Sequence, residues 1–304
     1  MFLGQISPSL SLSLLPLSQN NVFLSTFCFV SVSLAVLLAV GHKYLSGNFP
    51  LTSTTIFRSQ GDIEKAITQL KATIQWREEF GVLDLIHCLD GGGQGGNTNK
   101  GSSLNDERPS REELAKIIRL ENETGKMYAR GHDKEGRTLL YMRPAMENTN
   151  VELDNMRHLV YNLEKAISCS ANNERNKDGK ICLIIDYEGF QMRHAPSMST
   201  SRKTLNILQH HYPERMYRVY LCNPPLLFRT VWAMVKPFVD PVTKEKVCFC
   251  HGEKGLAKIQ QDMEGYHHYL EPCAGGSVGN PIRKFQSIEY LSLPFHVSFD
   301  EKQE

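Results

Sequence analysis

The feature that most constrains the fold is an alternation of short apolar runs with longer helical patterns between residues 110 and 263. The apolar runs cover residues 137–143, 181–187, 216–222 and 246–250. Helical patterns separate them and follow them at about 153–171, 199–211, 226–236 and 253–263. Because strands that alternate with helices assemble into a sheet covered by those helices, this order predicts an α/β domain, which we assign to residues 110–276.

Two further helical segments precede the alternation. One has an apolar side at spacings of three and four residues, made by Ile63, Ile67, Leu70 and Ile74 and extended by Trp76 and Phe80. This spacing predicts an amphipathic helix over residues 62–80 that ends at Gly81, within a short helical region at 56–90. Ser110, followed three residues later by Glu113, predicts a capping box at the start of the second helix.

Residues 91–109 and 277–304 carry no helical or strand pattern. The run GGGQGGNTNKGSS at 91–103 has no apolar content, and no Gly-Lys-Ser/Thr sequence follows the glycines, so a nucleotide-binding P-loop is excluded. We expect a flexible surface insertion at 91–109 and a C-terminal tail at 277–304.

The first 41 residues contain no Asp, Glu, Lys or Arg, and residues 22–40 are almost wholly apolar. That segment is long enough to cross a bilayer, and the missing basic region argues against a cleaved signal peptide. Residues 1–45 are therefore either a membrane anchor, with Lys43 favouring a cytosolic C-terminal domain, or a low-complexity leader. The expected location is the cytosol or the cytoplasmic face of a membrane.

Charge and cysteine content exclude other classes. A net charge of +1, from 34 basic and 33 acidic residues, does not provide the basic field that nucleic-acid binders use. The eight cysteines form no Cys-x-x-Cys pair and lie mostly in apolar runs, which is typical of buried thiols in a reducing compartment rather than of zinc ligands or disulfides. We predict no metal site and no nucleic-acid partner.

Four segments carry motifs in a characteristic order. The densest covers residues 209–249 and includes YPER, an Asn-Pro step, an aromatic-rich helix and KPFVDP. The others are QWREEFGV at 75–82, DKEGRTLLYMRP at 133–144 and LIIDYEGF at 183–190. Together they resemble the CRAL-TRIO family, phosphatidylinositol transfer protein type. The resemblance implies a mixed β-sheet flooring a hydrophobic cavity that holds a single lipid, with a gate helix over the mouth that opens at phospholipid membranes.

The gate corresponds to residues 226–243. This segment is apolar nearly all round, so it must be buried or must face a ligand on one side and a bilayer on the other. The side chains that we expect to line the gate and cavity are Phe228, Val231, Trp232, Val235 and Phe238.

The resemblance also implies a head-group site. Glu214 of YPER, Thr243 and Lys246 match the positions that hold phosphatidylinositol in the family, and Arg58 is a further candidate. The chemistry is coherent, because an ammonium and a hydroxyl can bind a phosphodiester while a carboxylate accepts hydrogen bonds from inositol hydroxyls. Residues 181–183 are Ile, Cys and Leu where phosphatidylcholine-binding members carry hydroxyl residues, so a choline-phosphate site is not expected.

The sequence favours a lipid carrier over an enzyme. Cys169 and Arg175 have the spacing of a phosphatase loop, but the loop glycine is missing and Cys169 falls at the end of a predicted helix. We expect no catalytic residue, no cofactor other than the bound lipid, and a monomer. Two alternatives remain open: a carrier of a retinoid- or tocopherol-type ligand, and a lipid-sensing adaptor.

Overall fold

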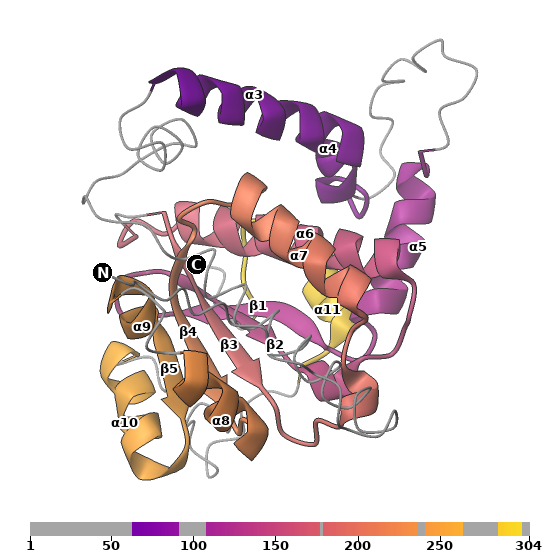
Figure 1. Cartoon of the computed structure of the whole chain (residues 1–304). Coiled ribbons are helices and arrows are strands. Elements are labelled where there is room, and N and C mark those ends of the chain that lie inside the picture. Colours follow the sequence, from indigo (N-terminus) through magenta and orange to yellow (C-terminus); the bar gives the residue numbers. More distant parts are fainter. Residues whose placement is uncertain (1–62, 91–107, 177–178, 236–240, 264–284, 300–304) are drawn as a thin grey trace, which may run out of the picture.

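A five-stranded sheet stands at the centre of the protein, in a computed structural model that describes residues 63–90, 108–176, 179–235, 241–263 and 285–299 (Figure 1). Its strands are β1 (Met127–His132), β2 (Thr138–Met142), β3 (Ile181–Asp186), β4 (Met216–Cys222) and β5 (Val247–Cys250), and they lie side by side in that order. β1 is antiparallel to β2, whereas β2 to β5 run parallel. The predicted mixed sheet is confirmed.

Helices connect the parallel strands. They are α6 (Glu152–Ala171) between β2 and β3, α7 (Met198–His211) between β3 and β4, α8 (Leu226–Val235) and α9 (Pro241–Lys246) between β4 and β5, and α10 (Gly252–Asp262) after β5. Short 3-10 turns lie at Pro144–Met146 and Met192–His194. The remaining helices are α3 (Ile63–Phe80), α4 (Val82–Ile86), α5 (Arg111–Asn122) and α11 (Ser287–Ser292). In Figure 1, α3 and α4 lie beyond α6 and α7, away from the sheet.

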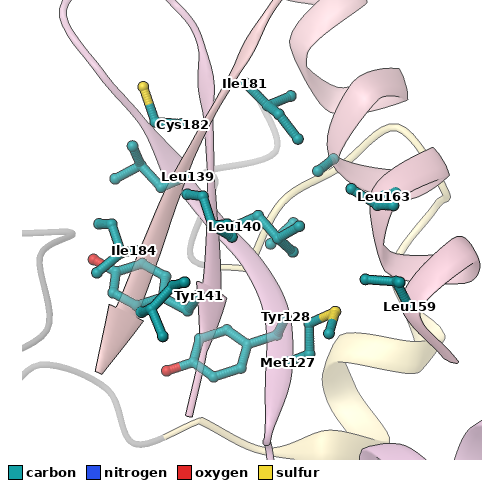
Figure 2. Close-up of a cluster of buried hydrophobic side chains, with 14 of the residues drawn as sticks. Met127, Tyr128, Leu139, Leu140, Tyr141, Leu159, Leu163, Ile181, Cys182 and Ile184 are labelled. Carbon is teal, nitrogen blue, oxygen red and sulfur yellow. The ribbon is translucent and has the colours of Figure 1, made fainter. Parts of the chain in front are cut away.

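The core lies on both faces of the sheet. Leu140 and Ile181 project toward α6, where Leu159 and Leu163 meet them, while the neighbouring residues Leu139 and Cys182 project to the opposite side (Figure 2). All these side chains are buried. The strands are apolar on both faces because each face is covered, as expected of parallel strands.

Local chemistry fixes the helix ends that the sequence predicts. Gly81 has φ +73°, in the left-handed region that glycine enters without a Cβ penalty, and it separates α3 from α4. At the start of α5 the Ser110 side chain accepts from the backbone N–H of Glu113, and the Glu113 carboxylate accepts from the backbone N–H of Ser110. The predicted capping box is confirmed.

The apolar side of α3 does not pack as its spacing suggests. Ala66 and Thr73 are the buried residues of this helix, whereas Ile63, Ile67 and Ile74 are 61%, 47% and 55% exposed. The helix itself is confirmed, but its isoleucines face away from the rest of the described structure.

The C-terminal segment 285–299 packs into the core, although its sequence shows no element. The phenol oxygen of buried Tyr290 accepts from the N–H of Ala129 on β1 (3.0 Å) and donates to Oδ1 of Asn162 on α6 (2.9 Å). Phe299 forms a parallel bridge with Arg130 on β1. The segment therefore covers the free edge of β1, where an unpaired strand could otherwise pair with a strand of another chain.

Buried Lys165 of α6 supports the same segment. Its ammonium donates to the carbonyl oxygen of Pro294 at 3.0 Å and lies over the ring of Tyr290, 5.1 Å from the centroid. Burial lowers the pKa of Lys165 to about 8. These contacts with the C-terminal segment offset part of the desolvation of the ammonium.

Within the described part of the chain, no helix has the length and apolar character needed to cross a membrane. The apolar segment 22–40 and the predicted insertion at 91–109 fall largely or wholly outside the described residues.

We predict that Tyr290→Phe lowers the free energy of unfolding by about 1–3 kcal/mol, because the buried N–H of Ala129 loses its acceptor. Urea unfolding monitored by circular dichroism would measure the change. Tyr217→Phe is the control: it retains the ring over which the Arg137 guanidinium lies and should change stability by less than about 0.5 kcal/mol. Equal losses in the two variants would contradict the proposed role of the phenol oxygen.

Candidate functional site

Two of the predicted head-group residues lie together at the amino ends of adjacent parallel strands. Glu214 lies two residues before β4, and Lys246 is the last residue of α9, directly before β5. The Lys246 ammonium is 3.7 Å from Oε2 of Glu214. This separation is longer than a hydrogen bond, so the contact between these two atoms is electrostatic.

Neither member of this pair is a solvated surface charge. The side chains of Lys246 and Glu214 are only 15% and 13% exposed. Charges that are removed from water to this extent interact more strongly with each other and with a charged ligand than surface charges do. A solvated ion pair of little consequence is therefore a poor description of Glu214 and Lys246.

The backbone at Glu214 is held in an uncommon conformation. Its φ is +58°, in the left-handed region that L-residues other than Gly, Asn and Asp seldom adopt. The next residue, Arg215, fixes the turn through its side chain and its backbone. Its Nη1 donates to the carbonyl of Gly179 (3.1 Å), and its own carbonyl accepts from the N–H of Ile181 (2.8 Å). Such strain persists where the surroundings enforce it, and it is common at functional sites.

A carboxylate on α6 holds the other side of this turn. Glu164 accepts from both terminal nitrogens of Arg77 on α3, at 2.5 and 3.2 Å, and from the phenol of Tyr212 at 2.6 Å. Burial alone would lower the pKa of Arg77, but the hydrogen bond and charge of Glu164 outweigh it and raise that pKa. Burial and the charge of Glu164 also raise the pKa of Tyr212, so the phenol remains a donor. Tyr212 is the first residue of the YPER segment that ends with Arg215.

An aromatic stack joins α3 to the same turn. The Trp76 indole lies parallel to the His211 imidazole, with ring centroids 4.0 Å apart and an interplanar angle of 3°. Tyr212 meets the indole edge-on at 6.1 Å. Thr73 donates from Oγ1 to the carbonyl of His210 at 3.2 Å. The N-terminal helix is therefore part of the scaffold that positions Glu214.

The predicted gate helix α8 packs through two described aromatic residues. Phe228 is buried with its ring 4.9 Å from that of Tyr187, and Trp232 is partly buried with its ring 5.9 Å from that of Phe249 on β5. Leu226, at the start of the helix, is 78% exposed.

The other predicted site residues are not placed by the structure. Val231 and Val235 lie in α8 and Thr243 lies in α9, but their side chains are outside the described part. Phe238 and Arg58 fall outside the described residues altogether. Their roles stay predictions.

A family model described as the CRAL/TRIO domain matches residues 122–267. This part of the chain is a CRAL-TRIO domain. The matched range contains Glu214, Lys246 and the whole of α8, whereas α3, which supports the turn at Glu214, precedes it.

Relatives of this CRAL-TRIO chain include named fungal proteins. It is 31% identical over 226 residues to phosphatidylinositol transfer protein PDR17 of Saccharomyces cerevisiae, covering 73% of this chain and 54% of that protein. It is 30% identical over 178 residues to SEC14 cytosolic factor of Candida glabrata, covering 52% and 59%. A CRAL-TRIO domain-containing protein of Schizosaccharomyces pombe is 38% identical over 132 residues, which are 43% of this chain and 13% of that protein.

The matched regions thus span less than two thirds of each of these relatives. Among solved structures, the crystal structure of Sfh5 is similar with a TM-score of 0.43 and 18% sequence identity, covering 65% of this chain and 62% of that chain.

At the carboxyl ends of the strands, a contact between β3 and the residue after β4 positions the start of α8 in this CRAL-TRIO domain. The Asp186 carboxylate, at the end of β3, accepts from the side-chain amide of Asn223 at 3.0 Å and from the N–H of Glu188 at 3.0 Å. Asn223 has φ +49°, which asparagine tolerates better than most residues. This contact fixes the turn before Pro224 and Pro225 that leads into α8.

We predict that acid weakens the contact between α3 and the YPER segment. Burial, with the charges of His210 and Arg77, lowers the pKa of His211 to about 4. The unfolded chain takes up a proton near pH 6.5, so this residue contributes stability that is complete above pH 6.5 and is lost as the pH falls toward 4.

The measurement is the free energy of unfolding at pH 7, 6 and 5. His211→Phe retains a ring against Trp76 but cannot titrate, so its stability should fall less steeply over this range. The same dependence on pH in the variant and the natural protein would rule His211 out as the responsible group.

Proposed function

We propose that this protein binds a single phosphatidylinositol molecule and transfers it between membranes or presents it at one. The observation that carries the proposal is the shielded Glu214–Lys246 pair at the amino ends of β4 and β5 in a CRAL-TRIO sheet. The naming of one relative as a phosphatidylinositol transfer protein supports the same ligand.

The two charges suit the two parts of this head group. The Lys246 ammonium can bind the phosphodiester, and the Glu214 carboxylate can accept hydrogen bonds from inositol hydroxyls. Thr243, one turn before Lys246 on α9, would add a hydroxyl donor. A retinoid- or tocopherol-type ligand offers no phosphate, so it would leave a largely shielded ammonium without an anionic ligand group to bind.

The acyl chains would lie under α8. Phe228 and Trp232 are separated by four residues and therefore share one side of the helix, which packs on Tyr187 and Phe249. Leu226, the first residue of α8, is exposed. A helix that packs on the sheet through aromatic side chains and exposes a leucine at its start can leave the sheet when a bilayer takes the place of water.

We place this activity in the cytosol or at the cytoplasmic face of a membrane, in line with relatives named SEC14 cytosolic factor. A lipid-sensing adaptor would use the same site. The two activities differ in one respect, since a carrier must release its lipid to an acceptor membrane and a sensor need not.

The first experiment is to purify the full chain, extract the lipid that accompanies it, and identify this lipid by mass spectrometry. A vesicle-to-vesicle transfer assay would follow, with labelled phosphatidylinositol in the donor vesicles. Bound phosphatidylinositol with transfer supports a carrier, whereas bound phosphatidylinositol without transfer supports a sensor. A phosphate-free apolar molecule in the extract would refute the proposal.

We predict that Lys246→Ala weakens phosphatidylinositol binding by roughly 10- to 100-fold, because a charge-assisted contact worth about 1.5–3 kcal/mol is lost. Titration with phosphatidylinositol vesicles would measure the loss, and thermal unfolding would confirm that the variant folds. Lys244→Ala removes the same charge from the same helix and should bind within about twofold of the natural protein. Comparable losses in both variants would show a general charge effect instead of a head-group contact.

We predict that Leu226→Asn slows lipid transfer between vesicles several-fold while occupancy and stability stay unchanged. The side chain is exposed, so its replacement leaves the packing of α8 on the sheet intact but makes insertion into a bilayer less favourable. Phe228 and Trp232 are unsuitable for this test because their replacement would also unpack α8. Ala233→Ser, at another exposed position of α8, is the control. An unchanged transfer rate in Leu226→Asn would argue against insertion of this end of the helix.

A further inference from the structure

The first described helix has two apolar faces, and the rest of the described protein covers one of them. Ala66 and Thr73 are buried, with Trp76 and Phe80 packed against the core. Ile63, Ile67 and Ile74 lie within roughly 40° of one another around the helix axis, and roughly 90° from the buried pair. These three isoleucines, which we call the isoleucine face, extend about 16 Å along α3.

The isoleucine face is more exposed to solvent than is usual for apolar side chains. The side chains are 61%, 47% and 55% exposed, although isoleucine is among the residues most often buried. Charged residues flank it, with Glu64 and Lys71 exposed on one side. An apolar stripe bordered by polar residues is typical of a surface that another element covers.

The chain itself supplies an element of matching chemistry, joined directly to this helix. Residues 1–62 precede Ile63 and lie outside the described part, and residues 1–41 contain no Asp, Glu, Lys or Arg. Residues 22–40 number 19, and as a helix they would be about 28 Å long, enough to cover the isoleucine face. The 22 residues at 41–62 can span up to about 70 Å, so the apolar segment can fold back onto α3 without strain.

We propose that residues 22–40 dock on the isoleucine face of α3 and cover it within the same chain. The apolar segment and the isoleucine face then bury each other, and both are removed from water. Docking also stabilises α3, the helix that positions the YPER segment through its contacts with His211 and Glu164. The segment therefore acts as a part of the folded domain and does not cross a membrane.

A cross-linking experiment on the full chain tests this proposal. Cys28 lies in the docking segment, the six cysteines of the described part are buried, and Cys273 would be replaced by Ser in every variant. Ile67→Cys places a thiol on the isoleucine face, while the control Ala72→Cys places one at an exposed position roughly 140° around the same helix. With a short bis-maleimide, we expect at least fivefold more Cys28-linked product from the first variant than from the second.

The cross-link must also be intramolecular. Equal amounts of ¹⁵N-labelled and unlabelled chains are mixed before cross-linking, and mass spectrometry of the linked peptides separates products within one chain from products between two. Mixed-isotope products from Ile67→Cys would assign the face to a second copy of the chain and overturn the proposal. Equal yields from the two variants, or none from either, would overturn it as well.

Hydrogen–deuterium exchange gives an independent result that does not depend on where Cys28 points. In the full chain without lipid or detergent, the amides of residues 22–40 should be protected, and Ile67→Asp with Ile74→Asp should speed their exchange at least tenfold. Ala72→Asp should not. Protection that appears only with phosphatidylcholine vesicles or detergent, and is the same in all variants, would make a bilayer the occupant and refute intramolecular docking.

Discussion

The Glu164 carboxylate is the contact on which the geometry of the site depends. It lies on α6, which packs on the sheet, and it binds Arg77 of α3 through two nitrogens and Tyr212 through its phenol. Three segments far apart in the sequence thus meet at one largely buried charge. Without it, the Arg77 guanidinium and the Tyr212 phenol would lose their partner, and the left-handed turn at Glu214 would have fewer constraints on its N-terminal side. The turn that carries Glu214 is therefore placed by α3, α6 and α7 together.

Local signals predicted most of the fold, and long-range contacts account for what was missed. The strand at 216–222 and the helix that ends at Ala171 follow from apolar runs bounded by turn residues, and the capping box at Ser110 is encoded by two side chains. β1 was not predicted because Arg130, Gly131 and His132 break its apolar pattern, yet all six of its residues are buried. Segment 285–299 was missed for a related reason: Tyr290 and Phe299 are ordinary aromatic residues until β1 and Lys165 meet them.

The candidate site, like the fold, depends on long-range contacts that local sequence signals do not predict. Glu214 and Lys246 are 32 positions apart in the sequence, and only the family resemblance predicted that they act together; the structure brings them to 3.7 Å. Arg77 and Tyr212 lie in segments that carry the family resemblance, but neither was predicted as a site residue, and no pattern marked Glu164. Charges on a helix are usually solvated, and here the packing of α3, α6 and α7 shields Arg77 and Glu164. The spacing of the isoleucines on α3 predicted a helix correctly but gave no information about which face the domain covers. The helical period of 3.6 residues identifies the apolar side of a helix, but it does not identify the element that packs against that side.

The two candidate head-group charges are attached to the sheet, whereas the candidate gate is a separate helix, and this arrangement suggests how lipid exchange can be selective. Glu214 belongs to a turn fixed by Arg215, Gly179 and Ile181, and Lys246 directly precedes β5, which is paired with β4. Both charges therefore stay with the sheet if α8 moves. The described side-chain contacts of α8, in contrast, are aromatic packing at Phe228 and Trp232, which a bilayer can replace at little cost because it is equally apolar. In the lipid exchange that we propose, opening of α8 would expose the acyl chains to a membrane while Glu214 and Lys246 keep their positions, so recognition would not have to be rebuilt in each cycle.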